Sequence, residues 1–297
     1  MTGEGSDRCP VVDDDMWRCA VSGRRTNTTG GLVLGDIGDV RRAAEALGEG
    51  AAVAHGFGNF YALTARADRE VVERVNRMKG RPAGQVGSVT TVREHVGSVF
   101  DWTRLPSELP RRQVEDLVEE LFVLGPFGFR GPASARIPPH LSAVQDGVTT
   151  VQLIGPGYRC PSNAFLAEAL ARTGAGFLSI TSVNRSRHRT GAEHEPAHWR
   201  AEGVSTDFGH EPDVRILAHD DEAVARRRHP HHGSMSTTVL SFHRTAGFGR
   251  SGLPALTLER HGSLSVDHTR AVAANHGFAL TVPPQAERRL PARTYAD

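Results

Sequence analysis

The sequence predicts a single mixed α/β domain, and three observations support this fold class. Apolar runs typical of strands interleave with amphipathic segments typical of helices, and the chain has no internal repeat. Of the 297 residues, 38% are hydrophobic and 23% are charged, which is the balance of an ordinary globular protein. Glycine and proline separate the segments. We expect the domain to span residues 36–282, with an N-terminal extension at 1–35 and a disordered tail at 283–297.

Charge and composition argue against several classes of protein. The net charge of +1 gives no global reason to bind nucleic acid or a membrane surface. No run of 18 apolar residues is present, and the first 30 residues lack the apolar stretch of a signal peptide. The 3 cysteines are too few for a disulfide scaffold. We therefore expect a cytoplasmic protein that has no membrane partner.

In the first half of the chain, helices are predicted where apolar residues recur on one face after a capping residue. Asp39 and Asp68 are the expected caps of two helices, and Gly80 with Pro82 ends the second of them. A glycine-punctuated segment at 55–61 follows the first apolar strand. The predicted elements of this half are, in chain order, helix 39–47, strand 51–54, helix 68–78, strand 86–92, helix 111–121 and an apolar loop at 124–129.

The second half of the chain contains most of the predicted strands. Ser162 is the expected cap of a helix that ends before Gly174. The apolar strand at 177–181 leads into the polar segment 182–186, and ligands bind at the carboxyl ends of strands in open α/β sheets. Residues 219–235 are predicted to be a charged, histidine-rich loop. The predicted elements of this half are, in chain order, strand 148–154, helix 162–170, strand 177–181, strand 214–218, strand 236–242, strand 256–259 and helix 267–275.

Lysine is almost absent from the chain. Lysine and arginine number 35 together, yet Lys79 is the only lysine. An ammonium group is compact and rotatable, so this position is a candidate for a function that a planar guanidinium cannot perform. Lys79 and Arg81 follow a helix and are separated by one glycine, so both cations can face one side of a loop and bind a polyphosphate. The alternative is a solvated helix end, where basic residues are favoured.

Ser182 and Asn184 place a hydroxyl and an amide just beyond a buried strand. Both groups can hydrogen-bond phosphate oxygens or help hold a hydrated Mg²⁺. An ordinary turn is the alternative interpretation, because serine and asparagine are common in turns.

Three patterns that are typical of metal sites are present in the sequence, but none of them indicates a metal site here. The segment His194-Glu195-Pro196-Ala197-His198 matches the zincin spacing, but Pro196 interrupts the helix that would place both histidines on one face. The loop at 229–232 has no cysteine or carboxylate cluster beside it and is expected to be solvated, and Cys9 and Cys19 have no second pair. No phosphate-binding P-loop or nucleophile elbow is present. We therefore assign no metal site.

Taken in order, these motifs resemble those of the YrdC-like family, whose members include the threonylcarbamoyl-AMP synthases of tRNA modification. The segment Lys79-Gly80-Arg81-Pro82 is similar to the family's K-x-R motif, and the segment 182–186 is similar to its S-x-N motif. The resemblance covers about 240 residues in the family's order. Further similar segments are Tyr61-Ala62-Leu63, Leu124-Gly125-Pro126, 213–217 and 236–239.

The resemblance implies a twisted mixed sheet, flanked by helices, around a concave nucleotide cavity. It also implies a reaction in which the carbamate of an amino acid, L-threonine by default, attacks the α-phosphate of ATP and releases pyrophosphate. ATP, bicarbonate, an amino acid and Mg²⁺ are the implied ligands, the chain is expected to be a monomer or homodimer, and RNA is a further candidate partner. The implied site residues are Lys79 and Arg81 as catalytic groups, Ser182, Asn184 and Ser236 with them as phosphate contacts, and Asn59, Tyr61 and Thr181 as substrate contacts.

The chain also departs from the family pattern in three segments. Gly56-Phe57-Gly58-Asn59 stands in place of P-T-E-T, Gln152-Leu153-Ile154 stands in place of R-V-P, and Gln85-Val86-Gly87 stands in place of an N-P-L pattern. Two alternative hypotheses therefore remain. One is a specialised paralogue that acts on a different small molecule. The other is a non-catalytic RNA-binding module in which residues 226–228 add phosphate contacts.

Overall fold

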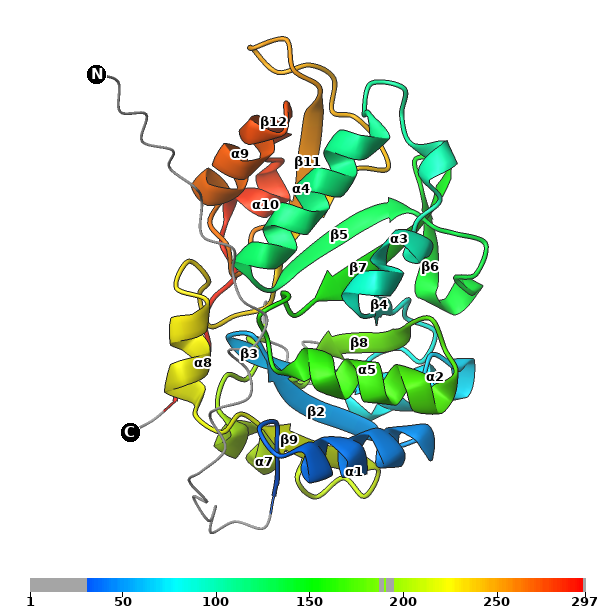
Figure 1. Ribbon diagram of the computed structural model, residues 1–297, viewed down its shortest axis with the longest axis vertical. Coiled ribbons are helices and arrows are strands. Elements are labelled where there is room, and N and C mark those ends of the chain that lie inside the picture. The colour runs from blue at the N-terminus through cyan, green and yellow to red at the C-terminus, as the bar shows by residue number, and fades with distance from the viewer. Residues whose placement is uncertain (1–30, 187–189, 191–194, 296–297) are drawn as a thin grey trace, which may run out of the picture. The chain divides into compact units, whose positions relative to one another are not determined.

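The computed structural model describes residues 31–186, 190 and 195–295, and residues 32–297 cluster as one unit. This unit is a twisted mixed sheet of 12 strands flanked by helices, so the predicted fold class is confirmed (Figure 1). The strands are β1 Leu32–Val33, β2 Ala52–Phe57, β3 Phe60–Ala65, β4 Ser88–Thr90, β5 Phe127–Pro132, β6 Ser142–Gln145, β7 Val148–Gly155, β8 Leu178–Ser182, β9 Val214–Ala218, β10 Thr238–Ser241, β11 Ala255–Arg260 and β12 Ala279–Thr281.

The strand order is β1-β9-β2-β3-β8-β4-β7-β5-β10-β11-β12, and β6 pairs with β7 outside this path. Parallel and antiparallel pairs are mixed: β2 pairs with β9 in parallel and with β3 in antiparallel orientation. Short 3-10 turns are present at Arg93–His95, Trp102–Arg104 and Pro139–Leu141. The helices are α1 Ile37–Gly48, α2 Arg69–Met78, α3 Val96–Val99, α4 Arg111–Leu124, α5 Ser162–Thr173, α7 Ala201–Phe208, α8 Glu222–Arg228, α9 Val266–Asn275 and α10 Pro284–Glu287. No helix in these described ranges is long and apolar enough to cross a membrane.

Local signals set the ends of the helices. Asp36 caps α1, because its side chain accepts a hydrogen bond from the backbone N–H of Asp39 at 2.9 Å. The predicted cap was Asp39, which instead lies in the first turn. Asp68 precedes α2 as predicted, and Gly80 follows its end with a φ of 74° that glycine adopts without strain.

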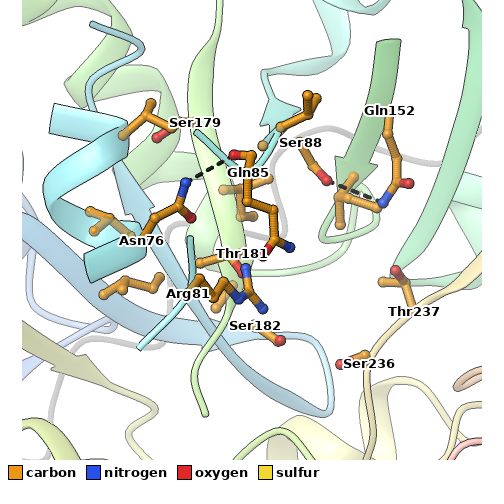
Figure 2. Close-up of a pocket in the computed structure, with 18 of the residues that line it drawn as sticks. Asn76, Arg81, Gln85, Ser88, Gln152, Ser179, Thr181, Ser182, Ser236 and Thr237 are labelled. Carbon is orange, nitrogen blue, oxygen red and sulfur yellow. Dashed lines mark hydrogen bonds between the residues drawn. The ribbon is translucent and has the colours of Figure 1, made fainter. Parts of the chain in front are cut away.

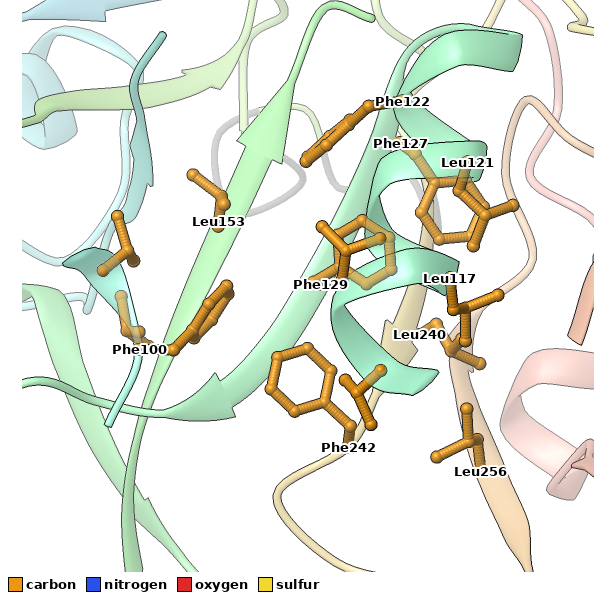
Figure 3. Close-up of a cluster of buried hydrophobic side chains, with 14 of the residues drawn as sticks. Phe100, Leu117, Leu121, Phe122, Phe127, Phe129, Leu153, Leu240, Phe242 and Leu256 are labelled. Carbon is orange, nitrogen blue, oxygen red and sulfur yellow. The ribbon is translucent and has the colours of Figure 1, made fainter. Parts of the chain in front are cut away.

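Helices cover both faces of β2, and the alternation of its side chains explains why. Val53 packs with α1 and α5 on one face, whereas Ala52 and Ala54 pack with α2 and α7 on the other. The largest hydrophobic cluster lies farther along the sheet, where α4 covers β5, β10 and β11 (Figure 3). Phe127 and Phe129 of β5 are fully buried there beneath α4.

Three segments differ from the sequence-based expectations. The glycine-punctuated segment at 55–61 contains the end of β2 and the start of β3, which pairs with β2 and β8 and is buried along its whole length. The expected apolar loop at 124–129 contains the start of β5, and the expected histidine-rich loop contains the helix α8. In each case tertiary pairing or packing orders a segment that local pattern left irregular.

The two ends of the domain also differ from expectation. The sheet begins at Leu32, because β1 pairs with β9, so the domain includes four residues assigned to the N-terminal extension. The expected disordered tail at 283–297 packs on the domain through residue 295. Tyr295 Oη lies 3.0 Å from His198 Nδ1, and Arg293 donates to the carbonyl of Pro196 at 3.0 Å. These contacts join residues almost 100 positions apart, which composition alone does not reveal.

Candidate functional site

A cavity of about 240 Å³ lies where β3, β8, β4 and β7 meet the loop at 81–87 and the loop at 236–237. Phe60, Ala62, Ile154 and Ile180 form part of its apolar wall. Polar side chains surround this space, and Figure 2 labels all of them except Arg260. They are Asn76, Arg81, Gln85, Ser88, Gln152, Ser179, Thr181, Ser182, Ser236, Thr237 and, from the end of β11, Arg260.

Arg81 reaches the cavity from the loop that follows α2. Asn76 shapes this loop, because its amide donates to the carbonyls of Ala83 and Gln85, both at 2.9 Å. The Nη1 of Arg81 donates to Thr181 Oγ1 at 2.8 Å, which holds the guanidinium against the end of β8. Burial lowers the pKa of Arg81. An arginine that is removed from water in this way gains most from a bound anion.

Arg260 supplies a second guanidinium from β11. Its Nε donates to the carbonyl of Thr237 and its Nη2 to Thr237 Oγ1, both at 2.8 Å. Burial, with a further contribution from the positive charge of Arg130, lowers the pKa of Arg260 to about 10. Arg260 therefore remains a cation at neutral pH, and it holds Thr237 in place beside it.

Gln152 shares the cavity wall, and Arg130 orients its amide. Arg130 donates from Nη2 to Gln152 Oε1 at 2.6 Å and from Nε to Glu259 Oε2, also at 2.6 Å. Because the oxygen of Gln152 is taken by Arg130, its NH₂ group is directed to Ser88 Oγ at 3.1 Å (Figure 2). The wall therefore presents hydrogen-bond donors to the cavity.

The charge of the cavity is one-sided. Arg81 and Arg260 are the only ionisable residues that line it in the described ranges, and no ion pair is found for either one there. Two positive groups among hydroxyls and amides favour an anionic ligand with several oxygens, such as a phosphate chain. The lining residues offer no carboxylate, so they do not fit a Mg²⁺ ion held by the protein itself.

The structure brings four predicted site residues together at the cavity. Arg81, Thr181 and Ser182 lie on one side, and Ser236 lies in the loop before β10 (Figure 2). The side chain of Asn184 is buried, and its amide is used within the chain. It accepts from Ser182 Oγ at 2.5 Å and donates to the carbonyl of Arg185 at 2.8 Å. Asn184 therefore shapes the turn after β8 and does not line the cavity.

Lys79 lies behind the cavity wall and not in it. Its side chain is fully buried, and Nζ donates to Thr181 Oγ1 at 3.1 Å and to the carbonyl of Ser182. The K-x-R and S-x-N segments therefore meet, as expected, but Lys79 Nζ is separated from the cavity by Thr181. The predicted direct contact between Lys79 and phosphate does not occur in this geometry.

Asn59 and Tyr61 point away from the cavity, although both were predicted to contact the substrate. Asn59 donates its amide hydrogens to the carbonyls of His229 and His232. Tyr61 donates to Glu222 Oε1 at 2.9 Å and accepts from the backbone N–H of His219 at 3.2 Å. Both side chains hold the segment around α8 against the sheet. Their neighbour Phe60 lines the cavity instead.

Sequence reasoning missed Arg260, Gln152, Thr237 and Ser88 as cavity residues. A weak signal existed for two of them, since Arg260 directly follows a predicted strand and Gln152 stands where the resembling family has arginine. Neither signal shows which face of the strand a side chain occupies.

No group of three or more histidine, cysteine, aspartate or glutamate residues in the described ranges is arranged to hold a metal. His194 of the zincin-like segment lies outside those ranges, as do Cys9 and Cys19. The loop at 229–232 was expected to be solvated, but His229 and His232 are buried. Burial lowers their pKa values to about 4 and about 3, respectively.

No protein-family model and no curated protein sequence matches the chain. Solved structures do match it. A doubly substituted variant of Sua5 from P. abyssi superposes with a TM-score of 0.58 at 20% identity, covering 84% of this chain and 63% of that one. The complex of P. abyssi Sua5 with L-threonine gives 0.55 at 19% identity, with 87% and 63% covered. A hypothetical protein of Streptococcus mutans, smu.1377c, gives 0.57 at 14% identity, with 82% and 94% covered. The chain thus matches less than two thirds of the Sua5 length.

Proposed function

We propose, for a chain that has the YrdC/Sua5-like fold, that the cavity binds a nucleoside triphosphate and supports formation of a carbamoyl-adenylate. The acceptor is an amino acid, with L-threonine as the default because P. abyssi Sua5 forms a complex with it. The carbamate of the acceptor attacks the α-phosphate of ATP, and pyrophosphate leaves. One observation carries this proposal. Two arginines, Arg81 and Arg260, line the same cavity, and no carboxylate lines it.

The residues present suit this chemistry without a side-chain nucleophile. Arg81 and Arg260 stabilise negative charge on the phosphate chain, and Ser236 and Thr237 donate hydrogen bonds to its oxygens. Water is partly excluded by the apolar wall, which strengthens each of these contacts. Catalysis by position and charge is the general strategy of phosphoryl-transfer enzymes.

Pyrophosphate release tests the proposal. The protein is incubated with Mg²⁺-ATP, bicarbonate and each of the common amino acids, and we expect turnover with L-threonine or with one related acceptor. Arg81→Met and Arg260→Met should each lower kcat/KM by about 10²-fold, the loss typical of removing one charge-stabilising donor. Arg270→Met is the matched control, because Arg270 lies on α9 with its side chain half exposed and paired with Asp267. Absence of both turnover and ATP-analogue binding would reject the proposal.

A different acceptor is the second candidate, and the turn between β2 and β3 favours it. The side chain of Asn59 points to the segment after α8, and the neighbouring Phe60 lines the cavity where Asn59 was expected. Pyrophosphate release with another small molecule, and none with L-threonine, would select this paralogue. Salt-dependent RNA binding without any turnover would instead select the non-catalytic RNA-binding module.

A further inference from the structure

The proposed reaction requires that an amine lose a proton, and the cavity itself contains no group that can take it. An amino acid in neutral water carries an ammonium group, and only the free amine can react with bicarbonate. The lining residues in the described ranges include no aspartate, glutamate, histidine, cysteine, tyrosine or lysine. The two lining arginines stay protonated and cannot act as bases. This inference rests on the proposed function and concerns the source of that missing base.

One basic group, the amine of Lys79, is hydrogen-bonded to a residue of the cavity wall. Lys79 Nζ is 3.1 Å from Thr181 Oγ1, and Thr181 lines the cavity. Arg81 donates to the same oxygen at 2.8 Å. Thr181 therefore touches the cavity, the arginine and the buried amine at once, which is the arrangement that a proton relay requires.

We propose that the acceptor is a primary amine that binds as its ammonium form, and that Lys79 accepts one proton from it through the hydroxyl of Thr181. The ammonium gives a proton to Thr181 Oγ1 while the hydroxyl proton of Thr181 passes to Lys79 Nζ. The net step is R–NH₃⁺ plus Lys79–NH₂ giving R–NH₂ plus Lys79–NH₃⁺. The free amine then reacts with bicarbonate to give the carbamate and water, so no second proton has to be removed.

The surroundings of Lys79 favour the neutral form of its amine, which is the form that can accept a proton. The side chain is fully buried, and no ion pair to a carboxylate is found for it in the described part of the chain. Burial, and then the positive charge of Arg81, lower the pKa of Lys79 well below the ordinary lysine value. On the side away from the cavity, Arg185 donates to the carbonyl of Met78 and pairs with Glu211 at 3.1 Å. The carboxylate of Glu211 is therefore paired with Arg185 and not with Lys79.

Both hydrogen-bond partners of Lys79 suit the relay. Lys79 Nζ has two partners, Thr181 Oγ1 and the carbonyl of Ser182. With a neutral amine, the hydroxyl of Thr181 can donate to the nitrogen lone pair while an N–H of Lys79 donates to the carbonyl of Ser182, which is the hydrogen-bond direction that the relay uses. Arginine at this position could not alternate between the two states, which gives a chemical reason for lysine in a chain that otherwise uses arginine.

The single lysine allows a direct test that needs no catalytic activity. Protein labelled with [¹³Cε,¹⁵Nζ]-lysine has one lysine side chain to observe by NMR, and its chemical shift reports its charge as pH is raised from 6 to 11. We expect Lys79 to lose its charge at a lower pH than an ordinary lysine does in water. A Lys79 signal that stays fully charged up to pH 10 would overturn the inference.

The pH profile of pyrophosphate release is the second test. In Lys79→Met and Thr181→Val, we expect kcat at pH 7 to fall by at least about 10²-fold, the usual contribution of general-base catalysis, and to recover as pH approaches the pKa of the acceptor's own amine. Lys79→Arg should behave like Lys79→Met. Thr206→Val is the control, because Thr206 is an exposed α7 residue whose hydroxyl bonds only within its helix.

The outcomes separate this inference from the function on which it rests. A loss in the variants that is constant across pH assigns Lys79 and Thr181 a purely structural role and overturns the relay. Failure of the wild-type protein to release pyrophosphate with any amine overturns the proposed function, whatever the NMR titration shows. Thermal melting of each variant distinguishes a folded, inactive protein from an unfolded one.

Discussion

Two buried imidazoles make folding of this chain sensitive to acid. His55 Nε2 lies 2.8 Å from Thr64 Oγ1, and His232 Nδ1 lies 3.1 Å from Ser263 Oγ. Burial lowers the pKa of each histidine to about 3. The unfolded chain binds these protons below about pH 6.5, whereas the folded chain does not until about pH 3. Stability is therefore lost as pH falls from about 6.5.

We predict that the free energy of unfolding decreases by about 3 kcal/mol for this pair between pH 7.5 and 5.5, because each such histidine contributes up to about 1.4 kcal/mol per pH unit. Urea denaturation at the two pH values measures the change. His232→Gln should make the pH dependence shallower by about half of that amount, whereas His95→Gln, at an exposed position, should leave it unchanged. An unchanged slope in His232→Gln would contradict this account.

At the scale of elements, packing of α4 on the sheet dominates the largest hydrophobic cluster. Leu117 and Leu121 face Phe127, Phe129 and Leu240 in the core beneath this helix (Figure 3). Val123 is on the same helix, and 48% of its surface is exposed. The amphipathic pattern predicts this division, since residues four apart share a helix face.

We predict that Leu121→Ala lowers the free energy of unfolding by about 2–5 kcal/mol, because it leaves a cavity in a close-packed core. Val123→Ala should change it by less than about 0.5 kcal/mol, as is usual at exposed positions. Urea denaturation of both variants at one pH gives the comparison. Equal losses would show that α4 does not pack as described.

At the scale of the molecule, the C-terminal segment packs against the rest of the domain through hydrogen bonds and an ion pair. Arg289 donates to the carbonyl of Gly262 at 2.9 Å, and Arg293 pairs with Glu195 at 2.9 Å. Tyr295 Oη accepts from the backbone N–H groups of Trp199 at 3.2 Å and Arg200 at 3.3 Å. The segment thus connects the end of β11 to the residues that precede α7.

We predict that Tyr295→Phe lowers the free energy of unfolding by about 1–3 kcal/mol, because it removes the hydrogen-bond partner of His198 and of two backbone N–H groups that are partly buried. Calorimetry should show a decrease in Tm of a few degrees, since about 1 kcal/mol corresponds to about 2–4 °C in a domain of this size. Thr294→Ala, at the neighbouring exposed position, serves as the control and should leave Tm unchanged. A Tyr295→Phe protein with the wild-type Tm would indicate that the segment is not held.

Local patterns were enough to predict the fold class and the order of most elements. The caps, glycines and apolar stripes of α2, α4 and α9 act within a few residues, so they can be read without knowledge of the fold. The pairing of the K-x-R and S-x-N segments was also predicted, and Lys79 does contact Thr181 and Ser182.

The composition of the cavity depended on strand pairing and register, which join segments far apart in the sequence. Glu259 and Arg260 are neighbours on β11, yet one pairs with Arg130 while the other lines the cavity, at the point where the register between β10 and β11 shifts. The same geometry buried Lys79 behind Thr181 and turned Asn59 and Tyr61 away from the cavity. A residue's type shows the chemistry that it can perform, but its neighbours across the sheet determine whether it can reach a ligand.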